Sequence, residues 1–105
     1  MEKLDSNTLY RELRNNIYSL EREVRYVSGV DRVDVRNYDV SSVGFSFRLQ
    51  VRLNDGASRR WAESDIKNKI ESFVNNMIYG LSRNYDVSDW RYPRFWIDID
   101  FEGGQ

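Results

Sequence analysis

Between positions 9 and 27 the apolar residues recur at intervals of three or four. At about 100° per residue this spacing keeps them within an arc of about 80°, which predicts an amphipathic helix over 9–27. Asp5 or Ser6 can cap its N-terminus, and Gly29 stands where a left-handed residue ends a helix. The apolar stripe consists of Leu9, Leu13, Ile17, Leu20, Val24 and Val27.

Three segments, 30–38, 43–53 and 94–102, alternate apolar and polar residues, which predicts β-strands with one apolar face each. The apolar faces carry Val33 and Val35 in the first, Val43, Phe45, Phe47, Leu49, Val51 and Leu53 in the second, and Phe95, Ile97, Ile99 and Phe101 in the third. The opposite faces carry Arg32, Asp34, Arg36 and Tyr38, then Gly44, Ser46, Arg48, Gln50 and Arg52, then Trp96, Asp98, Asp100 and Glu102.

The segment 57–61 follows a tight-turn signal, Asn-Asp-Gly at 54–56, and has two interpretations. It either returns as a short strand or opens the next helix. On a helix, Trp61 would point almost opposite to the apolar stripe, so we favour a short strand. A helix over 64–80 then follows, capped by Ser64 and ended by Gly80 or Asn84. Its predicted stripe is Ile66, Ile70, Phe73, Met77 and Leu81.

These elements predict one α+β domain over 1–105, with a loop over 84–93 and a flexible tail over 103–105. We expect a two-layer sandwich with two helices on one face of a sheet of three or four strands. The sheet is mostly antiparallel, and the order is α-β-β-(short β)-α-β. The last strand follows a helical crossover, so it should lie parallel to the strand before that helix.

The composition excludes several kinds of chemistry. The chain has no cysteine and no histidine, so it lacks a disulfide, a thiolate nucleophile and the commonest general base and metal ligand. It also has no glycine-rich phosphate loop, and no serine or threonine has a base at motif spacing. We therefore expect a protein that is not an enzyme and that has no cofactor.

Charge and hydropathy limit the partners. The net charge is −1, which gives no overall attraction to nucleic acid, but the basic residues are almost all arginine, which is enriched at protein interfaces. No apolar run approaches the roughly 18–20 residues of a membrane span, and "MEKLDSNTLY" lacks the apolar region of a signal peptide. We expect a cytoplasmic protein that does not contact a membrane.

The stretch "VGFSFRLQV" at 43–51 is similar to the signature strand of the RNA-recognition motif, whose two aromatic residues face the RNA. In that family the residues between and after the aromatics are apolar and enter the core. Here those residues are Ser46, Arg48 and Gln50, which cannot line a core. Phe45 and Phe47 are therefore expected inside, and RNA binding of that type is disfavoured.

The segment 88–96 is dense in aromatic and arginine side chains, which suit binding hot spots and base stacking. The segment 58–61 can add further arginines to the same surface. The hexapeptide RNYDVS, at 36–41 and again at 83–88, is favoured as turn chemistry used twice, and the alternative is twin loops that present a tyrosine each to a symmetric partner. The predicted partner-binding residues are Trp90, Arg91, Tyr92, Arg94, Trp96, Arg59, Arg60, Tyr38 and Tyr85.

Asp98, Asp100 and Glu102 share one face of the last strand, where such a row can hold Mg²⁺. We favour the alternative, in which the acids pair with arginines of adjacent strands and no metal is bound. Those arginines are Arg32, Arg36, Arg48 and Arg52.

Three functions follow, in order of preference. The first is a non-enzymatic protein-interaction or assembly module that self-associates or docks into a larger complex. In general character it is similar to small arginine-rich phage structural subunits and to phage inhibitors of host factors. The second is a nucleic-acid-binding domain that uses Arg59, Arg60, Arg91 and Arg94 with Trp90. The third is a Mg²⁺-dependent enzyme.

Overall fold

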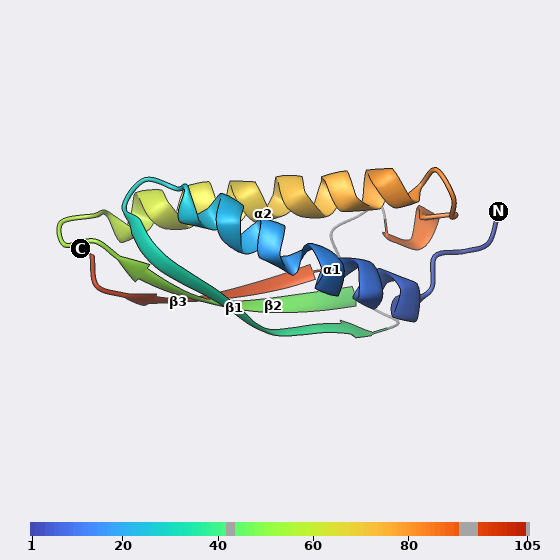
Figure 1. Cartoon of the computed structure of the whole chain (residues 1–105), viewed down its shortest axis with the longest axis horizontal. Helices are drawn as coiled ribbons and strands as arrows, with labels where there is room; N and C mark the ends of the chain where they lie inside the picture. The colour runs from blue at the N-terminus through green and yellow to red at the C-terminus, as the bar shows by residue number, and fades with distance from the viewer. Residues whose placement is uncertain (42–43, 91–94, 105) are drawn as a thin grey trace.

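The computed structural model describes residues 1–41, 44–90 and 95–104, and both of its α-helices lie on the same face of one sheet (Figure 1). The predicted two-layer α+β fold is confirmed. The elements are α1 (Ser6–Arg25), β1 (Val30–Ser41), β2 (Gly44–Leu53), α2 (Arg59–Leu81), a short 3₁₀ helix (Ser88–Trp90) and β3 (Phe95–Glu102).

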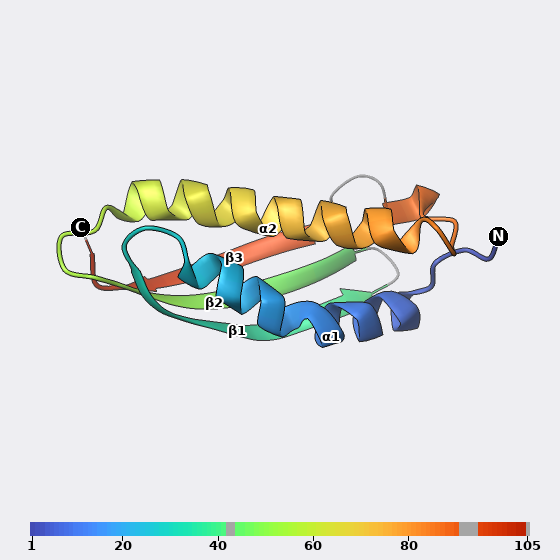
Figure 2. The ribbon, with the colours of Figure 1, turned by 45° about the horizontal axis from the view of Figure 1, so that its top comes forward.

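The sheet has three strands in the order β1-β2-β3 and is mixed. β1 pairs with β2 in the antiparallel sense, as adjacent strands of a hairpin do, whereas β2 and β3 are parallel. The predicted parallel arrangement after the α2 crossover is therefore confirmed. Figure 2 shows α1 running above β1 at one side of the sheet and α2 along the other side.

The prediction of a short strand at 57–61 is wrong, because α2 begins at Arg59. Ser58, not Ser64, is the N-cap, and its Oγ accepts a hydrogen bond of 3.4 Å from the backbone N–H of Trp61. The Trp61 side chain is 74% exposed, so its position opposite the apolar stripe did not prevent helix formation. The helix also continues through Gly80.

The core lies between the helices and the inner face of the sheet. Phe45 and Phe47 are 3% and 1% exposed, which confirms that the alternating face of β2 turns inward. The α1 stripe is buried as predicted except for Ile17, which is half-buried. The α2 stripe is offset from the predicted one, since its buried residues are Ala62, Ile66, Ile70, Val74 and Ile78. Phe73, Met77 and Leu81 are only partly buried.

A β-bulge in β1 changes which face Tyr38 occupies. Between the pairs Arg36↔Arg48 and Asp39↔Ser46, β1 advances by one residue more than β2. Asn37 has φ 52°, a left-handed conformation that asparagine tolerates better than most residues. The extra residue reverses the alternation, so the prediction that Tyr38 shares a face with Arg36 is wrong. Tyr38 instead stacks on Tyr10 of α1, with ring centroids 5.8 Å apart.

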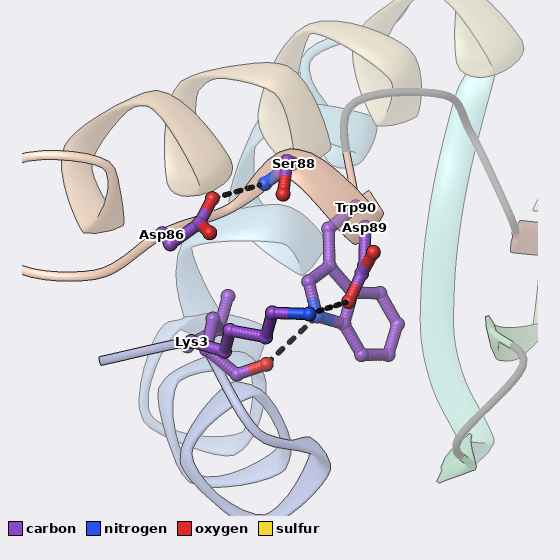
Figure 3. Close-up of polar contacts among 6 residues, drawn as sticks. Lys3, Asp86, Ser88, Asp89 and Trp90 are labelled. Carbon is purple, nitrogen blue, oxygen red and sulfur yellow. Dashed lines mark hydrogen bonds and ion pairs between the residues drawn. The ribbon is translucent and has the colours of Figure 1, made fainter. Parts of the chain in front are cut away.

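The N-terminal segment is tied to the segment that follows α2 (Figure 3). The backbone N–H of Leu4 donates to the carbonyl of Asp86 at 2.9 Å, and the N–H of Asp86 donates to the carbonyl of Glu2 at 2.7 Å. Lys3 Nζ lies 3.9 Å from Asp89 Oδ2, an exposed ion pair that stabilises the fold little. These contacts hold the residues that directly follow α2 against the N-terminal segment.

Candidate functional site

The face of the sheet that the helices leave uncovered carries a regular array of charged side chains. The strand register aligns polar residues from β1, β2 and β3 in rows across the sheet, because side chains at paired positions point to the same face. Arg32, Arg52 and Glu102 form one row, Asp34, Gln50 and Asp100 the next, Arg36, Arg48 and Asp98 the third, and Asp39, Ser46 and Trp96 the fourth.

We call the uncovered face of the sheet, with the four rows given above, the open face. Positive and negative side chains are divided unequally among its three strands. All four of its arginines lie on β1 and β2, whereas β3 contributes only carboxylates and Trp96. The predicted pairing of arginines with the acids of the last strand is confirmed for Arg48, whose Nε lies 4.0 Å from Asp100 Oδ2. On this face β1 thus carries mixed charge, β2 carries basic charge and β3 carries acidic charge.

Ion pairs on the open face are few and loose. Among the residues that the structure describes, the other one joins Arg32 Nε to Asp34 Oδ2 at 3.7 Å. Exposed pairs at such separations contribute about 0–1 kcal/mol each, because solvent screens them. Most charged groups on the face thus remain accessible to a partner.

A shallow depression of about 360 Å³ lies on the open face, across all three strands. Its walls are mostly polar and are formed by Arg32, Asp34, Arg36, Gln50, Val51, Arg52, Asp100, Phe101 and Glu102. Small-molecule sites are usually deeper and more apolar, so this hollow is better suited to side chains of a docking protein.

Trp96 stands at one end of the open face. Its side chain is 58% exposed, and its row partners are Ser46 and Asp39. Tryptophan and arginine are among the residues most enriched at interface hot spots. Of the predicted partner-binding residues, Trp96 is the one that the described structure places on this face.

Trp90 is buried, at 7% exposed, and it packs against Phe45 with ring centroids 6.4 Å apart. Its indole Nε1–H donates to the carbonyl of Leu4 at 3.0 Å (Figure 3). The prediction that Trp90 belongs to an exposed binding surface is therefore wrong, because a buried ring can neither meet a partner nor stack on a base. Arg91, Tyr92 and Arg94 lie outside the described residues.

Arg59 and Arg60 are exposed in the first turn of α2. Arg59 Nε donates to the carbonyl of Gly103 at 2.9 Å, which places it beyond the C-terminal end of β3, whereas Trp96 lies near the beginning of that strand. At about 3.3 Å per residue the two ends are about 20 Å apart. The structure thus does not bring 58–61 and Trp96 into one compact surface.

The two RNYDVS copies have different backbone conformations, so they are not twin loops. The first forms the bulged end of β1. The second follows α2, and there Asp86 Oδ1 accepts a hydrogen bond of 3.0 Å from the N–H of Ser88, an Asx-turn (Figure 3). Tyr38 and Tyr85 are both half-buried against the core.

Sequence reasoning missed a groove of about 640 Å³ between α1 and α2. It arises because Phe73, Met77 and Leu81 flank the buried row of α2 instead of forming it. Glu12 and Glu23 of α1 form part of the opposite wall. Five apolar residues at four-residue spacing, from Ala62 to Ile78, were the signal that could have revealed this offset.

The acidic row of β3 consists of Asp98, Asp100 and Glu102. In the ranges that the structure describes, no three acidic side chains are arranged to hold a metal ion. No helix within the described ranges has the length and apolar character needed to cross a membrane.

The chain matches no protein-family model and no curated protein sequence.

Proposed function

We propose that this domain is a non-enzymatic protein-interaction module, which docks into a larger assembly or associates with itself through the open face of its sheet. The observation that carries the proposal is the position of Trp96, 58% exposed at the end of an uncovered array of arginine and carboxylate side chains. The proposal includes a cytoplasmic location and a role as a structural subunit or inhibitor, of the kind found in phages.

The physical support is the combination of accessibility and loose pairing on this face. Charged groups that are not firmly paired within the fold can exchange solvent for a partner's charges, which gives specificity and fast association. The aromatic side chain at the end of this face supplies the apolar contact that such polar surfaces need for affinity.

The test compares the wild-type protein with Trp96→Ala and Trp61→Ala. Light scattering over a range of protein concentrations measures self-association, and affinity capture from the source organism identifies partners. We expect an oligomer or a defined partner that Trp96→Ala weakens and that Trp61→Ala leaves unchanged, although Trp61 is the more exposed at 74%. A strict monomer without any partner that depends on Trp96 would contradict the proposal.

The nucleic-acid alternative is weaker than the sequence suggested, because Trp90, its stacking residue, is buried. The remaining described candidates are Arg59 and Arg60, which are exposed and lie next to the exposed Trp61 in sequence. Fluorescence anisotropy with single- and double-stranded oligonucleotides at low salt tests it, since such binding falls steeply with salt.

A further inference from the structure

The two edges of the sheet differ in how they are protected. At the β1 edge, the Glu21 carboxylate of α1 accepts a hydrogen bond of 3.2 Å from the backbone N–H of Val35. A side chain that satisfies an edge amide blocks the addition of another strand at that position. In the described part of the chain, β3 pairs with β2 alone, so its outer edge lacks a strand partner.

The face of β3 that is turned toward the helices is also incompletely covered. Ile97, Ile99 and Phe101 are each only half-buried. Their register partners on β2, Phe47, Leu49 and Val51, are at most 1% exposed. Figure 2 shows β3 at the side of the sheet away from α1, and α2 packs less closely on β3 than α1 does on β1. Apolar surface therefore remains along the outer flank of β3.

The charges of β2 and β3 on the open face indicate which kind of strand could pair with the outer edge of β3. On the open face, β2 sets Arg48, Gln50 and Arg52 against Asp98, Asp100 and Glu102 of β3. Within the described residues, β2 is the strand that places basic side chains beside these acids. A strand added on the outer side that repeats the β2 pattern, basic on one face and apolar on the other, would complete both the charge pairing and the burial.

A second copy of β3 is a poor occupant. Antiparallel pairing of two β3 strands would place carboxylates of both copies next to one another on the open face. Like charges at neighbouring cross-strand positions are destabilising. The acidic row thus disfavours edge-to-edge dimerisation while it attracts a basic strand.

We infer that the outer edge of β3 is a strand-addition site for an extended segment of a partner protein in which basic and apolar residues alternate. This inference rests on the proposed protein-interaction function and names the partner's chemistry. Backbone hydrogen bonds would supply affinity that does not depend on sequence, and the alternating side chains would supply specificity.

The test uses a labelled peptide of 8 residues, the length of β3, that alternates arginine and valine. A block isomer with the same composition, four arginines followed by four valines, controls for charge and hydrophobicity. We expect the alternating peptide to bind the wild-type protein about tenfold more tightly than the isomer and to slow amide hydrogen exchange in 97–102, because the edge amides become bonded. Equal affinity of the two peptides, or protection confined to other elements, would overturn the inference.

Charge reversal gives a second, independent measurement. The Asp98→Lys/Asp100→Lys variant is expected to bind the arginine peptide about tenfold less tightly and to gain affinity for a glutamate-valine peptide. Circular dichroism establishes that the variant is folded. If the folded variant still prefers the arginine peptide to the glutamate peptide, the inference is overturned. It is also overturned if protection of 97–102 from hydrogen exchange rises with protein concentration in the absence of peptide, since the occupant would then be a second copy. If Trp96→Ala abolishes partner capture while the peptide fails to protect β3, the proposed function stands and this inference fails.

Discussion

The indole Nε1–H of Trp90 donates a hydrogen bond of 3.0 Å to the backbone carbonyl of Leu4, which lies 86 positions earlier in the chain. Both side chains are buried. The bond connects the first residues of the chain to the short 3₁₀ helix that follows α2.

Trp90→Phe should therefore destabilise the protein by about 1–3 kcal/mol, because the Leu4 carbonyl loses its donor and part of the ring volume is lost. Urea unfolding followed by circular dichroism measures the effect. Trp61→Phe is the matched control, since Trp61 is 74% exposed, and should change stability by less than about 0.5 kcal/mol. Similar losses in the two variants would contradict the burial of Trp90.

Adjacent residues of β2 should respond very differently to truncation. Phe47→Ala should cost about 3–5 kcal/mol, because it removes a side chain that is 1% exposed and leaves a cavity in the core. Arg48→Ala, on the open face, should cost about 0.5 kcal/mol or less. Chemical denaturation checks both values, and a larger loss for Arg48→Ala would reverse the assignment of the two faces.

Gly29 and Gly56 both have positive φ, of 88° and 83°, but only one is crowded. A Cβ at Gly29 would lie 2.8 Å from the Cβ of Ala57, whereas a Cβ at Gly56 has no atom within 4 Å. Each alanine substitution should cost about 1–3 kcal/mol for backbone strain, and Gly29→Ala should cost about 1–3 kcal/mol more for the clash.

The clash can be isolated in a double variant. Ala57→Gly removes the opposing methyl group and therefore the clash. The Gly29→Ala/Ala57→Gly protein should thus recover the part of the unfolding free energy that Gly29→Ala loses beyond the loss in Gly56→Ala. Thermal or urea unfolding of the four proteins gives the coupling energy. Strict additivity of the two substitutions would show that the contact is not made.

The bulge at Asn37 should tolerate glycine but not a β-branched residue. Asn37→Val places such a side chain at φ 52° and should cost about 1–3 kcal/mol, whereas Asn37→Gly should stay within about 1 kcal/mol. Nuclear Overhauser contacts between the rings of Tyr10 and Tyr38 report the local register. Retention of stability and of these contacts in Asn37→Val would rule out the left-handed conformation.

The carboxyl of Asp86 should contribute to the acid sensitivity of the fold. The hydrogen bond that the backbone N–H of Ser88 donates to this carboxyl lowers its pKa below the ordinary value of 3.8, and the charge of Lys3 lowers the pKa by a smaller amount. A carboxyl whose pKa is lower in the folded state stabilises the fold above the unfolded pKa, and this contribution is lost as the pH falls through the folded pKa.

Asp5 should behave in the same way, because the N–H of Thr8 donates to it at 2.7 Å and lowers its pKa. Carbon-detected NMR titration should give a midpoint below 3.8 for both carboxyls. The Asp86→Asn protein should lose less stability than the wild type on acidification below that pH. An equal loss in the variant would show that Asp86 is not a source of the acid sensitivity.

The sequence alone determined the layers of this fold. The period of two in β2 and the three-to-four spacing in α1 are local consequences of strand and helix geometry, so they identified the buried faces and the polar open face without any tertiary information. The same alternation placed Trp96 and the acids of β3 together, because residues two apart on a strand share a face.

Tertiary structure decided the features that depend on neighbours. The bulge that turns Tyr38 inward required the pairing of β1 with β2, since one strand by itself does not show an extra residue. Trp90 entered the core because the Leu4 carbonyl lay within reach as a hydrogen-bond acceptor, which a local pattern cannot reveal. The hydrogen bond that protects the β1 edge at Val35 depends on where Glu21 of α1 lies relative to the sheet, and only the packing of helix on strand sets that position.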